Sequence, residues 1–267
     1  MIDFIVAILF GLIQGVTEFL PVSSSGHLLL THKFLSLPID NELAFDIVLH
    51  FATFLAVFLY FLKDIVKILK SWLKSFSGKI DENARTGWQI ILATIPAALA
   101  GYFLEDIIEN KLRSVFVVVI MLFTVALLFI IFEKIKNKQK EISAINWKET
   151  LIIGFAQSLA LIPGTSRSGI TIIAGLGVGL KREAAVRFSF LLSLPIILGA
   201  SIKKIPQLFD TGLSSYEFSI LLIAFCASFI SGWLTIKYFL RFVKKHSLIS
   251  FALYRIALAI IVLLLFL

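Results

Sequence analysis

Two short stretches of the sequence place polar and ionisable residues in the middle of apolar segments. In the first, Gln14 and Glu18 are four residues apart and therefore share one face of a helix. An ionisable side chain inside an apolar span costs several kcal/mol unless it has a partner, so we interpret Glu18 as functional. Its carboxylate can transfer a proton or supply oxygen to a divalent cation. The alternative is a buried carboxyl group that is hydrogen-bonded to a neighbouring helix.

Hydroxyl groups and a histidine follow this helix directly. Pro21 ends the helix, and Ser23, Ser24 and Ser25 are residue types that cap a helix or form a loop with exposed backbone N–H groups. His27 lies three residues after Ser24, and a serine within reach of an imidazole is the minimum pair for an activated nucleophile. The spacing reveals no complete Ser-His-Asp triad. A buried, hydrogen-bonded histidine is the alternative for His27.

The second stretch is a loop of glycine and hydroxyl residues with one arginine among them. Backbone N–H groups at a helix start, the helix dipole and a planar guanidinium together form an anion site. An arginine at this depth requires an anion, and phosphate is the obvious candidate. The residues that we expect to hold it, after Pro163 and Gly164, are Thr165, Ser166, Arg167, Ser168 and Gly169.

The composition indicates the surroundings in which these residues lie. Of the 267 residues, 59% are hydrophobic and 16% are charged, and the mean hydropathy is +0.97. These values exclude an ordinary water-soluble domain and predict an all-α integral membrane protein, since a β-barrel would show alternating hydrophobicity. The formal charge of +8 comes from clusters between apolar segments. The clusters therefore indicate membrane orientation and not nucleic-acid binding.

The hydropathy pattern predicts six transmembrane helices. They cover residues 43–62, 86–104, 114–132, 185–202, 218–240 and 249–267. The connections 63–85, 133–149 and 237–245 are rich in lysine and arginine and are expected on the cytoplasmic side, whereas 105–113 is acidic and is expected outside. His50 lies within the first of these spans. It could line a cavity, but a lone histidine in a span is more often a packed, hydrogen-bonded side chain, and we expect that here.

Two further apolar regions, 1–37 and 151–180, are each interrupted in the middle by proline, serine and glycine. Basic residues flank the second region on both sides, so it must enter and leave by the cytoplasmic face as a re-entrant helical hairpin. The first region is expected to form a similar hairpin from the external face. Residues 11–26 also resemble residues 154–169, and three spans follow each hairpin. We therefore predict one membrane domain built as an inverted-topology repeat, with halves at about 1–135 and 150–267 joined by a basic cytoplasmic loop.

If the two breaks meet near the membrane midplane, a carboxylate, serines and a histidine face an arginine and a phosphate-binding loop. This combination predicts phosphoryl transfer on a lipid, because a lipid reaches an intramembrane site while its tail stays in the bilayer. Secondary transporters are also built from broken helices and inverted repeats, so a transporter or flippase of phosphate-carrying lipids is the alternative. The serine and histidine favour the enzyme, since transport does not need them.

The two motifs resemble the signatures of the bacterial undecaprenyl-diphosphate phosphatases of the bacitracin-resistance type. The similarity lies in residues 14–27, QGVTEFLPVSSSGH, and 163–169, PGTSRSG, and extends to 91–98 and 188–195. It implies six spans plus two re-entrant hairpins, usually in a homodimer. It also implies hydrolysis of undecaprenyl diphosphate to undecaprenyl phosphate and inorganic phosphate, which recycles the carrier lipid for peptidoglycan synthesis and confers bacitracin resistance. The expected location is the bacterial plasma (inner) membrane, with the site open to the external side.

The resemblance also assigns residues to roles. It makes Glu18, Ser24, His27 and Arg167 catalytic and implies a divalent cation, Mg²⁺ or Ca²⁺, for which Glu18 is the possible ligand. The substrate-binding residues are Gln14, Ser23, Ser25, Thr165, Ser166, Ser168 and Gly169. Many family members carry glutamate where this chain has Gln14. An amide cannot act as a base, so we expect Gln14 to orient the substrate or the cation.

Overall fold

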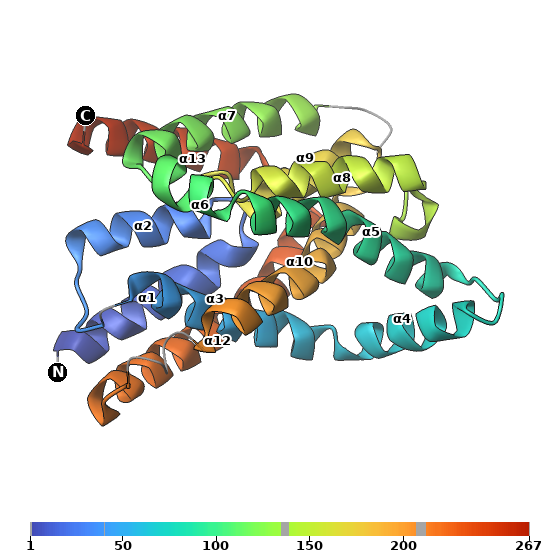
Figure 1. Ribbon diagram of the computed structural model, residues 1–267. Coiled ribbons are helices and arrows are strands. Elements are labelled where there is room, and N and C mark those ends of the chain that lie inside the picture. The colour runs from blue at the N-terminus through green and yellow to red at the C-terminus, as the bar shows by residue number, and fades with distance from the viewer. Residues whose placement is uncertain (1, 40, 135–138, 207–211, 267) are drawn as a thin grey trace.

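The computed structural model describes residues 2–39, 41–134, 139–206 and 212–266, and within these ranges the chain is helical (Figure 1). Seven of the described helices are long and apolar enough to cross a membrane. They are α1 (Ile2–Phe19), α3 (Glu42–Tyr60), α5 (Glu82–Phe103), α7 (Val115–Glu133), α10 (Arg182–Lys204), α12 (Ser215–Val243) and α13 (Ile249–Phe266). An integral membrane protein is therefore confirmed, and the six predicted spans correspond to six of these helices. Lys136 and Lys138 of the predicted basic loop, and Leu267, lie outside the described residues.

The two interrupted regions are each a pair of helices. The first consists of α1 and α2 (Ser24–Phe34), and the second of α8 (Trp147–Leu159) and α9 (Arg167–Gly177). The 13 residues of α8 rise about 20 Å and cannot cross a bilayer core of about 30 Å. The 18-residue α1 is longer than we expected for half of a hairpin and is the seventh span-length helix. We call residues 20–27 the first tip and residues 160–169 the second tip, so that each tip includes the start of the helix that follows the break.

The remaining described helices connect the long ones. Helix α4 (Leu62–Ser75) follows α3 and has no buried residue, and α6 (Glu105–Ile107) leads into a π-helical turn (Ile108–Leu112) before α7. A short 3₁₀ turn (Ile142–Ala144) precedes α8. The amphipathic α4 carries Lys63, Lys67, Lys70 and Lys74, as expected of a helix that lies along anionic headgroups.

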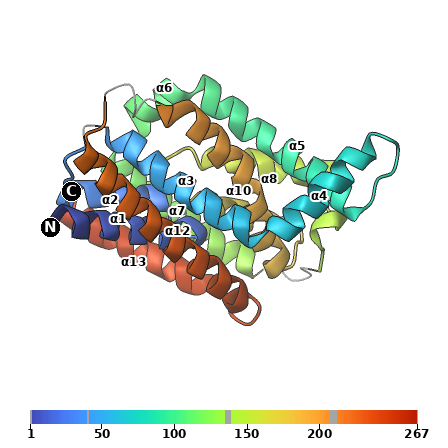
Figure 2. The ribbon, with the colours of Figure 1, turned by 90° about the horizontal axis from the view of Figure 1, so that it is seen from below.

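Each broken helix packs against a long helix from the other part of the chain. Helix α1 lies on α12, and α8 lies on α5. Both contacts use glycine where backbones meet: a Cβ atom on Gly11 would lie 2.3 Å from the carbonyl oxygen of Ala224, and one on Gly154 would lie 2.8 Å from that of Ala93. In Figure 2, α3 lies between α10 and α12, in agreement with their contacts.

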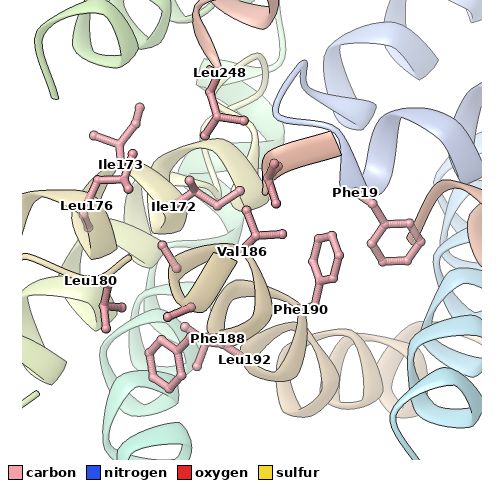
Figure 3. Close-up of a cluster of buried hydrophobic side chains, with 14 of the residues drawn as sticks. Phe19, Ile172, Ile173, Leu176, Leu180, Val186, Phe188, Phe190, Leu192 and Leu248 are labelled. Carbon is pink, nitrogen blue, oxygen red and sulfur yellow. The ribbon is translucent and has the colours of Figure 1, made fainter. Parts of the chain in front are cut away.

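A cluster of buried apolar side chains surrounds the inner ends of the broken helices (Figure 3). Phe19 ends α1 and meets Phe190 of α10 edge to face, with ring centroids 5.2 Å apart. Ile172 of α9 and Val186 of α10 belong to the same cluster and are fully buried. Because closely packed side chains have little freedom to move, this cluster fixes the ends of α1 and α9, where the polar residues lie.

Candidate active site

The two tips have the same local geometry. Ser23 and Ser166 both adopt positive φ, 79° and 72°, although neither is glycine. Each caps the following helix: Ser23 Oγ accepts a hydrogen bond from Gly26 N at 3.3 Å, and Ser166 Oγ accepts one from Gly169 N at 3.0 Å. Such strained residues cluster at functional sites. The caps leave other N–H groups at the starts of α2 and α9 available to an anion.

The tips contact each other directly and through one arginine. Ser168 Oγ donates to the carbonyl oxygen of Leu20 at 3.1 Å. Arg255 of α13 is fully buried, and its guanidinium donates to the carbonyl oxygens of Pro21 at 3.2 Å and Gly164 at 2.9 Å. It also donates to those of Thr165, Met121 and Leu122. Arg255 thereby holds both tips against α7.

Glu18 connects the reactive groups of the two tips. Its Oε2 accepts a hydrogen bond from Ser24 Oγ at 2.7 Å, and its Oε1 accepts one from Arg167 at 2.7 Å. A second Arg167 nitrogen donates to the carbonyl oxygen of Ser189 on α10 at 2.8 Å. Glu18 is 5% exposed. Its carboxylate can be buried there because these charge-assisted hydrogen bonds offset the cost of removing the charge from water. One carboxylate thus holds a hydroxyl and a guanidinium from opposite tips.

His50 belongs to this cluster: it is hydrogen-bonded, as expected, but its partners are Gln14 and the Glu18 carboxylate, and it also lines a cavity. Its Nδ1 lies 3.1 Å from Glu18 Oε2 and 2.8 Å from Gln14 Nε2. Gln14 is fully buried, and its Nε2 also donates to Glu18 at 3.1 Å. The carboxylate oxygen that faces Ser24 is therefore surrounded by an amide and an imidazole.

His27 does not contact Ser24, and the predicted serine–histidine pair is absent from the described structure. His27 Nδ1 lies 2.7 Å from the carbonyl oxygen of Ser23, and Nε2 lies 2.8 Å from the hydroxyl of Tyr254. The imidazole stacks on the Tyr254 ring at 5.8 Å. The carbonyl at the helix N-cap turns the ring away from Ser24, so Glu18 is the group placed to take the Ser24 proton.

The other predicted substrate-binding residues divide into two groups. The hydroxyls of Ser23, Ser166 and Ser168 make hydrogen bonds within or between the tips, and a Cβ atom on Gly169 would lie 3.0 Å from Ser166 Oγ. These residues shape the tips. Thr165 is fully buried, and its Oγ1 has no hydrogen-bond partner. Ser25 Oγ has only a 3.4 Å contact with Ser23 Oγ and lines a cavity.

The donors for a cation are few. Among the described residues, no group of three or more His, Cys, Asp and Glu side chains is arranged to hold a metal ion. Next to the Glu18 carboxylate, however, the Oε1 atom of Gln14 is buried without a hydrogen-bond partner. Mg²⁺ is commonly bound by one or two carboxylates together with phosphate oxygens of the substrate. Glu18 and Gln14 therefore fit a cation that the substrate helps to hold.

The fold and this site define a class of helical membrane protein in which two broken helices bring a buried carboxylate, a serine hydroxyl and an arginine together. A family model, described as bacitracin resistance protein BacA, matches residues 7–261. The chain is 42% identical to an undecaprenyl-diphosphatase of Rubrobacter xylanophilus, with 98% of each chain covered. It is 43% identical to undecaprenyl-diphosphatase 1 of Pseudoalteromonas translucida, with 95% of each covered, and 42% identical to an undecaprenyl-diphosphatase of Teredinibacter turnerae, with 97% of this chain and 98% of the relative covered. The chain belongs to the BacA family.

Sequence reasoning missed Arg255, Tyr254 and Ser189, and it misjudged His50. One signal was present for Arg255, because it is an ionisable residue within an apolar span, and such residues are functional or paired by default. His50 carried the same signal, because it too is an ionisable residue within an apolar span. Ser189 contributes through its backbone carbonyl, which has no sequence signature.

Proposed function

We propose that this protein hydrolyses undecaprenyl diphosphate to undecaprenyl phosphate and inorganic phosphate in a bacterial plasma membrane. The carrier lipid then returns to peptidoglycan synthesis, and its recycling confers bacitracin resistance. The observation that carries the proposal is the Glu18 carboxylate, which accepts from Ser24 Oγ and from Arg167 at 2.7 Å each. A serine hydroxyl on a carboxylate is a nucleophile beside its base, and the adjacent guanidinium is a phosphate ligand. A lipid flippase would need the phosphate-binding guanidinium but not the serine.

These contacts support the following reaction. Ser24 Oγ attacks the terminal phosphorus, its proton passes to Glu18, and the bond from that phosphorus to the bridging oxygen breaks, which releases undecaprenyl phosphate. Water then attacks the phosphorus of the phosphoserine and the P–Oγ bond breaks. The Ser24 oxygen takes back the proton held by Glu18, and inorganic phosphate leaves with the protons of the water. Arg167 and the N–H groups at the start of α9 hold phosphate oxygens on which negative charge develops. His50 and Gln14 hold the Glu18 carboxylate in place throughout.

A divalent cation, Mg²⁺ or Ca²⁺, would be held by Glu18, Gln14 and the diphosphate. When bound, it supplies positive charge that neutralises the diphosphate oxygens. Arg167 approaches the same anion from the other tip. The positive charge that the chain itself places beside the diphosphate is therefore the Arg167 guanidinium. The proposal also predicts that a chelator stops turnover.

The proposed topology is six transmembrane helices with two re-entrant hairpins. In Figure 1, α1 and α2 lie together in the left part of the molecule, and α8 and α9 lie in the right part. The ends of α1 and α9 are joined by the Glu18–Arg167 pair, so α1 stops where the second hairpin also stops. Lysines of α4 favour the cytoplasm for the side opposite α2, which opens the site to the external face.

The inverted repeat is supported by matching details. Ser23 corresponds to Ser166 in backbone angle and cap, and the contact of α1 with α12 corresponds to that of α8 with α5. In this correspondence Ser24 matches Arg167. The repeat therefore places the nucleophile and the phosphate ligand at equivalent positions, one on each tip.

The test is phosphate release from undecaprenyl diphosphate by the purified protein in detergent, with and without EDTA. We expect release that requires the metal and that falls at least a hundredfold in Glu18→Gln, because this change removes the base but keeps the shape. Glu149→Gln is the matched control, since Glu149 belongs to the capping box of α8, away from the tips. Wild-type rates in Glu18→Gln, or lipid binding without any release, would overturn the proposal.

A further inference from the structure

Within the part of the chain that the structure describes, Arg113 is a cation without a partner, at the outer end of the structure. It follows the π-helical turn Ile108–Leu112, immediately before α7. The side chain is half-buried, and it makes no hydrogen bond or ion pair with any described residue. Two deeper arginines, in contrast, are held: Arg167 by Glu18, and Arg255 by carbonyl oxygens. A partly desolvated guanidinium without a counter-ion attracts an anion.

Arg113 lines a cavity that reaches the active site. The cavity has a volume of about 200 Å³ and extends from Leu43 and Arg113 to Ser25, His50 and Pro163. It therefore runs from the outer loop to residues of both hairpins. His50 at its inner end touches the Glu18 carboxylate. A molecule that leaves the active site through this cavity therefore passes Arg113.

The cavity favours a small anion at its outer end. One carboxylate, Asp46, lines it, but this group is hydrogen-bonded to His32 Nε2 at 2.9 Å. Arg113 also lines a second, outer cavity of about 410 Å³ together with Lys33, Glu42 and the residues Ser114 and Val115. The Glu42 carboxylate is exposed and lies 3.8 Å from His32 Nδ1. The guanidinium thus stands where the inner cavity meets the outer one. Its planar set of N–H donors matches phosphate oxygens.

We propose that Arg113 forms a second phosphate site, in the passage between the active site and the outer face. This proposal rests on the diphosphatase activity, whose product is inorganic phosphate. The ligand is a phosphate group, either the free product on its way out or the terminal phosphate of the lipid on its way in. Arg113 does not contact the reacting atoms and is a binding residue, not a catalytic one.

The test compares Arg113→Gln with Lys111→Gln, which removes the same charge from an exposed position two residues away. In the first arm, the ³¹P NMR line width of inorganic phosphate is titrated with detergent-solubilised protein. In the second arm, KM for undecaprenyl diphosphate and the inhibition constant for inorganic phosphate are measured. Arg113→Lys, which keeps the charge, shows whether any loss in Arg113→Gln comes from misfolding.

We expect Arg113→Gln to weaken binding of inorganic phosphate about tenfold, the effect of one charge-assisted hydrogen bond. Lys111→Gln should match the wild type. A rise in KM with unchanged binding of inorganic phosphate would instead identify the lipid-linked phosphate as the ligand. Equal behaviour of Arg113→Gln and Lys111→Gln in both arms would overturn the site. The NMR arm needs no turnover, so failure of the hydrolase proposal would be seen separately.

Discussion

Arg255 offers the sharpest test of how the two tips are held together. Its guanidinium donates to the carbonyl oxygens of Pro21, Gly164 and Thr165, and within the described residues no other donor reaches these three atoms. Arg255→Met keeps most of the side-chain volume but leaves three buried acceptors without a partner. Each costs about 1–3 kcal/mol.

The expected loss of stability is therefore about 3–5 kcal/mol, because the tips relax and the three costs do not add fully. For a chain of this size, 1 kcal/mol corresponds to roughly 2 °C in Tm, so Tm should fall by at least about 6 °C. Activity below Tm should also fall, since the hydroxyl and the guanidinium are carried by the two tips that Arg255 connects.

The assay is thermal unfolding followed by intrinsic tryptophan fluorescence in detergent, together with phosphate release at a temperature well below Tm. Arg85→Met is the control, because Arg85 is exposed and donates only to the carbonyl oxygen of Ser143. Arg255→Lys should be intermediate, since an ammonium group satisfies fewer carbonyl oxygens. An Arg255→Met protein that unfolds within 2 °C of the wild type (about 1 kcal/mol) and keeps full activity would refute this reasoning.

Four further predictions follow from individual contacts. Arg167→Lys should lower kcat about 10²- to 10³-fold, because an ammonium cannot bridge Glu18 and the Ser189 carbonyl and still bind phosphate; a loss below tenfold would contradict this role. His27→Gln should cost less than tenfold in kcat, because His27 contacts Tyr254 and not Ser24, whereas a thousandfold loss would restore the histidine relay. Gly15→Val should reduce Tm by several degrees, since the new Cβ would lie 2.0 Å from Ser231 Oγ, and an unchanged Tm would disprove the close contact of α1 and α12. Partial burial acts to raise the pKa of Glu149, but hydrogen bonds from Lys140 and Asn146 outweigh it and hold that pKa below its usual value. The ionised group therefore stabilises the fold at pH values above its unfolded pKa, and this contribution is lost as the pH falls through the lowered folded-state pKa. The Tm deficit of Glu149→Gln should shrink over that range, and a deficit independent of pH would contradict this.

The sequence predicted those features that depend on local pattern. Uninterrupted apolar segments marked six helices, and Pro21 and Pro163, together with the serines and glycines after them, marked the two breaks. Proline alone does not end a helix here, since Pro96 lies within α5 and Pro195 within α10. Glu18 and Arg167 were identified by the cost of burying a charge, which requires a partner. That they are each other's partner follows from a contact across 149 residues, which spacing cannot reveal.

The site contacts that were missed are of the same long-range kind. His50 lies 36 residues from Gln14, and Arg255 lies 234 residues from Pro21. The prediction that His27 contacts Ser24 failed for a local reason. Nearness in sequence suggested contact, but the His27 imidazole turns toward the carbonyl oxygen of Ser23 and toward α13. Which of several nearby acceptors a side chain uses depends on neighbours that the sequence does not position.

The most direct test of the central claim is phosphate release from undecaprenyl diphosphate by Ser24→Ala. The claim is that Ser24, held by Glu18, attacks the terminal phosphorus. It predicts a rate at least a hundredfold below that of the wild type, with lipid binding kept and with Ser158→Ala, a serine of α8 bonded to the Gly154 carbonyl, unaffected. Turnover in Ser24→Ala close to that of Ser158→Ala would contradict the claim and leave water as the attacking group.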